Sequence, residues 1–117
     1  MHHETGTCPV DVVRRLHEVR AGGGRIVAVG TTSVRVLETA AQSGELIPWQ
    51  GTTDLFIRPP HTFHAVDALM TNFHLPRTSF LVLVRTFGGD ILMQKAYSEA
   101  IAEEYRFYSY GDSMLIL

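Results

Sequence analysis

The segment best equipped to bind a nucleoside is the run YRFYSYGD at residues 105–112, near the end of the chain. It places four aromatic residues in six positions, interleaved with an arginine and a serine. Aromatic rings stack on nucleobases at about 1–3 kcal/mol each, and arginine both neutralises phosphate and stacks on rings. A buried aromatic cluster whose hydroxyls bond to nearby backbone is the alternative. The pattern alone leaves both interpretations open.

A second candidate is the turn GTTS at residues 30–33, which follows the apolar run RIVAV. We expect a strand, this turn and then a helix. The first turn of a helix presents backbone N–H groups at its positive end, and hydroxyl side chains add donors. In α/β layers, ligands collect outside the carboxyl ends of strands. Because the turn lacks the glycines of a dinucleotide fingerprint and the lysine of a phosphate loop, a plain N-cap remains the alternative.

A third candidate is the run TNFHLP at residues 71–76. Thr71, Asn72 and His74 suit the edge of a base or ribose hydroxyls, and Phe73 offers an aromatic face. Histidine has an ordinary pKa of about 6.5, which makes His74 a candidate proton carrier. The alternative is a structural loop held by hydrogen bonds of the Asn72 side chain.

The remaining titratable residues indicate less. The histidines at residues 2–3 and the pair His61 and His64 lack the ligand number and spacing of a zinc site, so we expect solvated or capping side chains and no metal. Asp54 and Asp112 lie near expected strand ends, where functional loops concentrate. Glu38, three positions after an arginine, favours a solvated side chain or an intrahelical ion pair.

The composition describes one small globular domain. The 117 residues are 45% hydrophobic and 19% charged, with a net charge of −2. Because the net charge is small, any nucleic-acid surface should be a local patch. Nine of the ten basic residues are arginine, which suits bidentate phosphate contact and stacking. The single cysteine, the lack of a visible signal peptide and the lack of a membrane-length apolar run lead us to expect a cytoplasmic protein without a membrane partner.

The expected elements alternate as in an α/β layer. Apolar periodicity and glycine or proline boundaries predict helices at 9–20, 34–42, 79–86 and 90–104, with Thr78 capping the third. Strands are expected at 25–29, 54–57 and 113–117, and 65–69 suits a strand or a short helix. The apolar face of the last helix should carry Ile91, Leu92, Ala96, Ala100 and Ile101. The predicted fold class is α/β, with a layered, partly parallel sheet flanked by helices.

Five blocks in this order resemble one family. They are IVAVGTTSVR, LE, TDLFI, VDALMTNFHLP and YRFYSYGD, beginning at residues 26, 37, 53, 66 and 105. Together they resemble the S-adenosylmethionine:tRNA ribosyltransferase-isomerases of queuosine biosynthesis. The resemblance implies transfer and isomerisation of the ribosyl moiety of S-adenosylmethionine onto 7-aminomethyl-7-deazaguanine at the wobble position of the tRNA anticodon loop. Epoxyqueuosine would form, adenine and methionine would be released, and no metal would be needed.

The resemblance also suggests roles for individual residues. His74 or Asp54 would transfer the proton. Residues expected to hold S-adenosylmethionine are Gly30, Thr31, Thr32, Ser33, Asn72 and Phe73. Residues expected to contact the tRNA substrate are Arg35, Arg77, Tyr105, Arg106, Tyr108, Tyr110 and Asp112.

Members of the resembled family are much longer, with an α/β domain interrupted by a β-barrel-like domain. We therefore expect residues 1–117 to be the C-terminal part of the α/β catalytic domain, with its N-terminal part and the inserted β-barrel domain absent. The alternative is a catalytically inactive, truncated fragment that folds and at most binds a nucleoside or RNA. Surface left by the missing domain would favour self-association.

Overall fold

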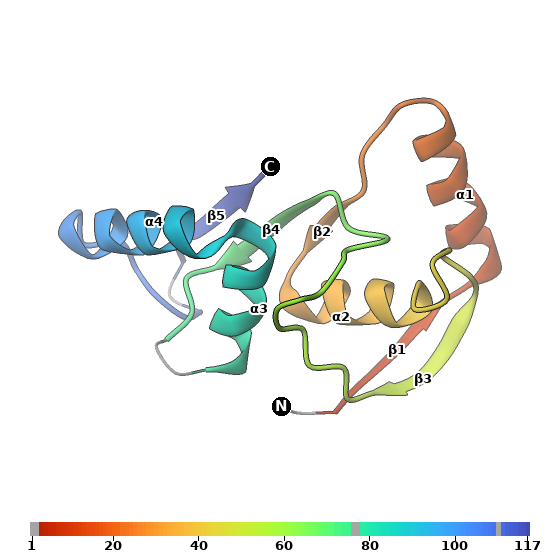
Figure 1. Ribbon diagram of the computed structural model, residues 1–117, viewed down its shortest axis with the longest axis horizontal. Coiled ribbons are helices and arrows are strands. Elements are labelled where there is room, and N and C mark those ends of the chain that lie inside the picture. The colour runs from red at the N-terminus through yellow and green to blue at the C-terminus, as the bar shows by residue number, and fades with distance from the viewer. Residues whose placement is uncertain (1–2, 76–77, 110) are drawn as a thin grey trace.

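The computed structural model describes residues 3–75, 78–109 and 111–117, and within them it has a mixed α/β architecture of four helices and two sheets (Figure 1). The predicted fold class, a partly parallel sheet flanked by helices, is confirmed. In chain order the elements are β1 (Glu4–Cys8), α1 (Val10–Ala21), β2 (Val27–Val29), α2 (Thr31–Ala40), β3 (Trp49–Thr53), β4 (Ala68–Asn72), α3 (Ser79–Gly88), α4 (Asp90–Ala102) and β5 (Ser113–Ile116).

The main sheet has the strand order β2–β4–β5, with β2 parallel and β5 antiparallel to β4. In this register Val29 lies opposite Met70, and Asn72 lies opposite Ser113. The carboxyl ends of β2 and β4 and the first residue of β5 therefore meet at one edge of the sheet.

Helix α2 joins the main sheet to the antiparallel pair β1–β3, and Figure 1 shows it between them. Val34 belongs to the main core, which α3, α4 and the three-stranded sheet also build. Ala40, further along the same helix, belongs to a second core shared with α1 and β1. The helix is thus fixed on both sides, which fixes the position of its first turn.

A buried carboxylate on α2 holds the segment that leads into β4. The oxygens of Glu38 accept hydrogen bonds from the backbone N–H groups of His64, Ala65 and Val66 at 3.0, 2.8 and 3.1 Å, and Oε1 lies 3.0 Å from His61 Nε2. The side chain is 1% exposed. The prediction of a solvated side chain or intrahelical pair is therefore wrong, because the carboxylate satisfies backbone donors that would otherwise be buried without acceptors.

A second carboxylate links α1 to the starts of β2 and β4. Asp67 accepts hydrogen bonds from the Arg20 guanidinium and, at 2.7 Å, from the backbone N–H of Ile26. Burial alone would raise the pKa of Asp67, but these hydrogen bonds and the charge of Arg20 lower it below its ordinary value. The charged carboxylate therefore stabilises the junction of the two parallel strands.

The predicted strand at 54–57 is wrong, and β1 and β3 were not expected. The backbone after β3 bonds to side chains instead of to another strand. Leu55 donates its N–H to Thr53 Oγ1 at 3.1 Å and accepts from Arg35 Nε at 3.0 Å. Side-chain partners of this kind compete directly with a β-ladder.

The helix boundaries agree better with the expectations. Thr78 Oγ1 accepts from Leu81 N–H at 3.2 Å, so the predicted N-cap of α3 is confirmed. The apolar face predicted for α4 is wrong for three residues, since Ile91, Leu92 and Ile101 are 86%, 56% and 66% exposed. Ala100 is buried and Ala96 packs against the main core, as predicted, and Met93 is buried in place of the three exposed residues.

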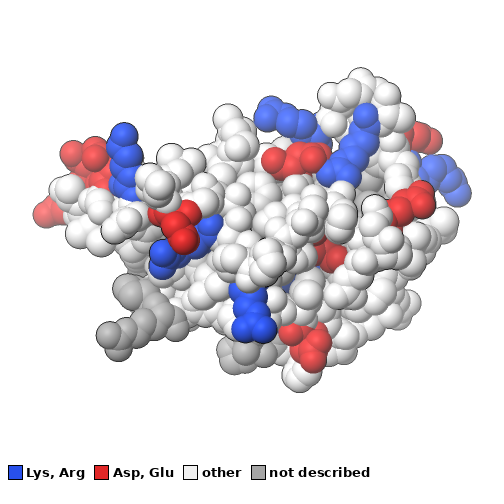
Figure 2. All heavy atoms as spheres, viewed as in Figure 1, with Lys and Arg blue, Asp and Glu red and all other residues white. Residues whose placement is uncertain are grey.

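On the face shown in Figure 2, lysine and arginine side chains are interspersed with aspartate and glutamate, as the small net charge suggests. Among the residues that the structure describes, no helix has the length and apolar character needed to cross a membrane.

Candidate functional site

A cavity of about 380 Å³ lies where β2 and β4 end and α2 begins. This is the edge of a parallel sheet at which α/β proteins bind ligands. Val29 and Met70 give the cavity apolar surface, and the remaining lining is mostly polar. The residues that line it are Val29, Gly30, Thr31, Thr32, Met70, Thr71, Asn72, His74 and Ser113.

The turn between β2 and α2 brings backbone N–H groups to this cavity. Gly30 has φ +90° and ψ 153°, a conformation that is essentially restricted to glycine. Its N–H donates to Met70 O at 2.8 Å. Helix α2 begins at the next residue, Thr31, instead of at residue 34 as expected. Thr31 and Thr32 line the cavity, and the Thr32 hydroxyl also donates to Glu4 Oε1 at 3.3 Å. The Ser33 hydroxyl donates to Val29 O at 3.0 Å.

His74 lies at the same cavity with its ring half-buried. Its Nε2 is 2.9 Å from Thr71 Oγ1, and its backbone N–H donates to the Tyr97 hydroxyl at 2.9 Å. Burial lowers the pKa of His74 below its ordinary value, because desolvation disfavours the charged imidazolium. The neutral imidazole can therefore accept a proton at neutral pH, as a general base must.

A smaller cavity of about 160 Å³ adjoins the first and is lined by Thr31, Asn72, His74, Phe80, Tyr108 and Ser109. The first three residues line both cavities. The backbone N–H of Tyr108 donates to Phe73 O at 2.8 Å, which ties the aromatic run to the segment at 71–76. The structure thus brings together the three runs that the sequence singled out.

Phe73 lies in the core and not at the cavity wall. Its ring is 4% exposed and is enclosed by the rings of Tyr97, Tyr105 and Phe107, at centroid distances of 5.4, 5.7 and 5.4 Å. Part of the aromatic run therefore forms the buried cluster that was the alternative interpretation. Phe73 positions the backbone around His74 and does not offer its ring to a ligand.

Arg35, expected to contact substrate, is fully buried. Its Nε donates to Leu55 O at 3.0 Å, and Nη1 lies 3.5 Å from Glu4 Oε1. This environment corrects the expectation, since the guanidinium binds the protein's own backbone and a carboxylate of β1. It stabilises the segment after β3.

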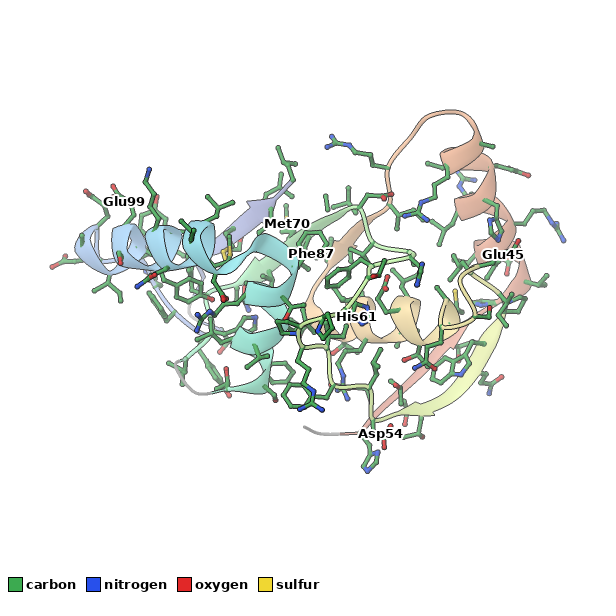
Figure 3. The ribbon with its side chains drawn as sticks, in the orientation of Figure 1. Glu45, Asp54, His61, Met70, Phe87 and Glu99 are labelled. Atoms are coloured by element: carbon green, nitrogen blue, oxygen red, sulfur yellow. The ribbon has the colours of Figure 1, made fainter. Side chains whose placement is uncertain are left out.

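The other predicted residues are scattered. Asp54 is exposed beyond the end of β3, outside both cavities, and Figure 3 shows it well apart from Met70. Asp112 accepts a hydrogen bond from the backbone N–H of Arg106, so it shapes the aromatic segment. Arg106 and Tyr105 are exposed outside both cavities. Arg77 and Tyr110 lie outside the described residues.

Sequence reasoning missed two contributors to the site. Phe80 lines the smaller cavity with its ring centroid 5.6 Å from that of His74, and Glu38 fixes the segment before β4. Glu38 had a readable signal, because it follows the buried Val34 by one helical turn and so shares its inward face. Nothing local marked Phe80. Within the described part of the chain, no group of three or more histidine, cysteine or acidic residues is arranged to hold a metal.

The chain has the mixed α/β fold, and its cavity lies at the carboxyl ends of parallel strands, which is the usual place of a ligand site in α/β proteins. The family to which it belongs is more specific. Residues 1–116 match the family of queuosine biosynthesis proteins, and the chain belongs to that family.

Named relatives agree with this assignment. The chain is 52% identical over 116 residues to the S-adenosylmethionine:tRNA ribosyltransferase-isomerase of Francisella philomiragia, and 57% identical over 117 residues to that of Anaeromyxobacter dehalogenans. The alignments cover 99% and 100% of this chain and 34% of each relative. The crystal structure of S-adenosylmethionine tRNA ribosyltransferase from Thermotoga maritima matches with a TM-score of 0.89 and 55% identity, over 95% of this chain and 39% of that one. The chain thus spans about a third of the length of the curated relatives it matches.

Proposed function

We propose that this chain forms part of the active site of an S-adenosylmethionine:tRNA ribosyltransferase-isomerase. The enzyme transfers and isomerises the ribosyl moiety of S-adenosylmethionine onto 7-aminomethyl-7-deazaguanine at the wobble position, giving epoxyqueuosine, adenine and methionine. Family membership supports the reaction class. The observation that carries the proposal is the cavity in which the first turn of α2, Asn72 and His74 converge.

In this proposal the chain is the C-terminal part of the α/β catalytic domain. The N-terminal part and an inserted β-barrel domain belong to the remaining length of the relatives, and the 34% coverage supports this division. The partner is the anticodon loop of tRNA, and the reaction takes place in the cytoplasm.

The larger cavity binds S-adenosylmethionine, which is the ribosyl donor. Its volume of about 380 Å³ falls within the range of small-molecule sites. The uncharged first turn of α2 directs N–H groups and the positive end of the helix dipole toward the methionine carboxylate. Hydroxyls of Thr31 and Thr32 suit the ribose, and Val29 and Met70 suit the carbon chain beside the sulfonium.

His74 transfers the proton. The sulfonium makes the adjacent C5′ protons acidic, and the neutral imidazole accepts one of them. The electron pair left at C5′ breaks the C4′–O4′ bond and gives a C4′=C5′ vinyl sulfonium, and the released oxygen forms an aldehyde at C1′ as adenine leaves with a proton. The amine of the modified base then adds to C4′ and loses a proton, and the C5′ carbanion so formed attacks the C1′ aldehyde and closes the carbocycle. The resulting C1′ alkoxide displaces methionine from C5′ and closes the epoxide. Because Asp54 lies outside the cavity, His74 is preferred to it for this role.

The test uses a full-length relative with alanine at the position equivalent to His74. Removal of a general base lowers turnover by about 10²–10⁴-fold, measured as adenine release and epoxyqueuosine formation. The matched control is His64→Ala, since the side chain of His64 is exposed away from this cavity. Near-normal turnover of the His74 variant would remove this residue from the chemistry.

A second candidate function is a catalytically inactive fragment that at most binds a nucleoside or RNA. The uncovered face of the main sheet favours it. Val29, Met70 and Leu115 are neighbours across the three strands and are 65%, 38% and 51% exposed. Sheets with parallel strands are normally covered on both faces, so this face is also where self-association is expected.

Direct binding identifies an inactive fragment that has no ligand, and recovery of turnover separates the proposed function from a fragment that binds without catalysis. An inactive fragment without ligands should show no binding in two experiments: calorimetry of the 117-residue chain with S-adenosylmethionine, and a gel shift with the tRNA anticodon stem-loop. Co-expression with the remaining part of a relative tests whether a complete site can be restored. Failure to recover epoxyqueuosine would count against restoration.

A further inference from the structure

We infer that the smaller cavity is a subsite for a planar, purine-like base, and that His74 separates it from the donor cavity. The inference rests on the proposed function, because it names the ligand group that the second half of the same site takes. Two substrates carry such a ring: S-adenosylmethionine has adenine, and the tRNA has 7-aminomethyl-7-deazaguanine.

The size of the smaller cavity suits a single ring system. At about 160 Å³ it is well below the roughly 300 Å³ at which sites for whole ligands begin. It shares Thr31, Asn72 and His74 with the larger cavity, so one layer of side chains divides the two. A ring bound on one side therefore lies next to the ribose bound on the other, within reach of His74.

Two aromatic side chains from distant parts of the chain line this cavity. Phe80 comes from the first turn of α3, and its ring is tilted by 35° relative to that of His74. Tyr108 comes from the aromatic segment and remains 55% exposed, whereas Phe73 is enclosed by its neighbours. An exposed ring at a cavity wall retains its face for a ligand, and stacking is the interaction that every nucleobase offers.

The backbone at Tyr108 is held in an unusual conformation. Its φ is +64°, which is uncommon for a residue other than glycine and unfavourable for a large side chain. The hydrogen bond from its N–H to Phe73 O helps to hold the residue there. The fold therefore fixes Tyr108 at the cavity at some cost in backbone energy.

Polar atoms at the same cavity suit the edge of a base. The Asn72 amide has both a donor and an acceptor, and the hydroxyls of Thr31 and Ser109 can do either. This set matches the mixed donor and acceptor edge of a purine. The methionine carboxylate is better matched by the larger cavity, because that cavity includes more of the first turn of α2.

The test compares Tyr108→Asn with Tyr108→Phe in the 117-residue chain. Asparagine adopts positive φ more readily than most residues, so it removes the ring with little backbone change, and phenylalanine keeps the ring. Calorimetry measures binding of S-adenosylmethionine and of the free base 7-aminomethyl-7-deazaguanine separately. We expect Tyr108→Asn to weaken one of the two by at least about fivefold, with wild-type affinity in Tyr108→Phe.

The outcomes separate the sources of the ring and the two proposals. A loss for S-adenosylmethionine assigns the subsite to adenine, and a loss for the free base assigns it to the tRNA. Unchanged binding of S-adenosylmethionine and no Tyr108-dependent binding of the base would overturn the subsite alone. If the wild-type chain binds neither ligand, the proposed function fails for this chain as well.

A control for the loss of an exposed ring completes the design. Phe56→Asn makes a similar substitution at an aromatic residue that is 42% exposed and lies outside both cavities. It should leave both affinities unchanged. An equal loss in this variant would show that binding follows the overall stability of the chain, and the subsite would be overturned.

Discussion

Helix α2 carries polar side chains in two regions that differ in what they contact. In its first turn, Thr31 and Thr32 face a cavity. One to two turns further, Arg35 and Glu38 are 0% and 1% exposed, and they bond to backbone groups of the segments at 53–55 and 64–66. The buried pair holds the fold, and the first turn lines the cavity, with the Thr32 hydroxyl also donating to Glu4 Oε1 at 3.3 Å.

This difference in burial separates the structural polar residues of α2 from the candidate functional ones. Arginine and glutamate in a helix beside a candidate site invite a role in binding, as Arg35 did. Burial among backbone partners decides against it, because a charge is kept in the interior only where its hydrogen bonds are made. The less conspicuous threonines are the better candidates.

The largest expected effect comes from Glu38→Ala. The substitution leaves three backbone N–H groups and His61 without their acceptor, and each buried donor left without a partner costs about 1–3 kcal/mol. We expect a loss of several kcal/mol in the free energy of unfolding, enough to unfold a domain of ordinary stability. Urea denaturation followed by circular dichroism measures it. Glu99→Ala, at an exposed position of α4, is the control. An equal loss of unfolding free energy in this variant would contradict the structural role assigned to the buried Glu38.

How much of the fold and the site the sequence predicts depends on whether the contacts join residues adjacent in the chain or distant from one another. The turn at Gly30 and the cap at Thr78 were predictable because they depend on residues adjacent in the chain. Strand β3 was missed because its sequence, WQGTT, contains glycine and lacks an apolar alternation, and its pairing with β1 spans about forty residues. The burial of Phe73 likewise depends on rings from α4 and the aromatic segment, which no local pattern brings together.

The next effect concerns the backbone of the first turn. Gly30→Ala places a Cβ where no atom lies within 4 Å, so its cost is purely conformational, about 1–3 kcal/mol for a residue forced into this region. We expect reduced stability together with weaker binding of S-adenosylmethionine, measured by denaturation and calorimetry.

Gly44→Ala is the matched control for that change. Gly44 also has a positive φ, of +100°, with no atom within 4 Å of an added Cβ, and it lies outside this cavity. It should lose stability and keep its affinity for S-adenosylmethionine. Equal affinity losses in both variants would show that binding follows global stability and not the geometry of the turn.

A smaller effect is expected for a single hydroxyl. Thr31→Val keeps the side-chain shape and removes one hydrogen bond to the donor, which is worth about 1 kcal/mol, or roughly a fivefold loss of affinity. Ser33→Ala, two positions later, should leave affinity unchanged because its hydroxyl bonds to Val29 O. Calorimetry on both variants checks this, and the reverse order of effects would contradict the proposed site.

The smallest expected effect is the contribution of His74 to the change of the free energy of unfolding with pH. Burial lowers the pKa of His74 in the folded state below its ordinary value of 6.5, so the unfolded state binds a proton more readily. Above pH 6.5 both states are neutral at this residue and it contributes no pH dependence. As the pH falls through 6.5, the free energy of unfolding should decrease.

His74→Gln isolates this contribution, since glutamine does not titrate and can still reach Thr71 Oγ1. The difference between the wild-type and variant free energies of unfolding, measured in urea from pH 8 to pH 5, removes the titration of the other histidines. That difference should be constant at the alkaline end and fall on acidification. A flat difference would mean that His74 titrates alike in both states, and the desolvation that keeps it neutral, and hence fit to accept a proton in the cavity, would be absent.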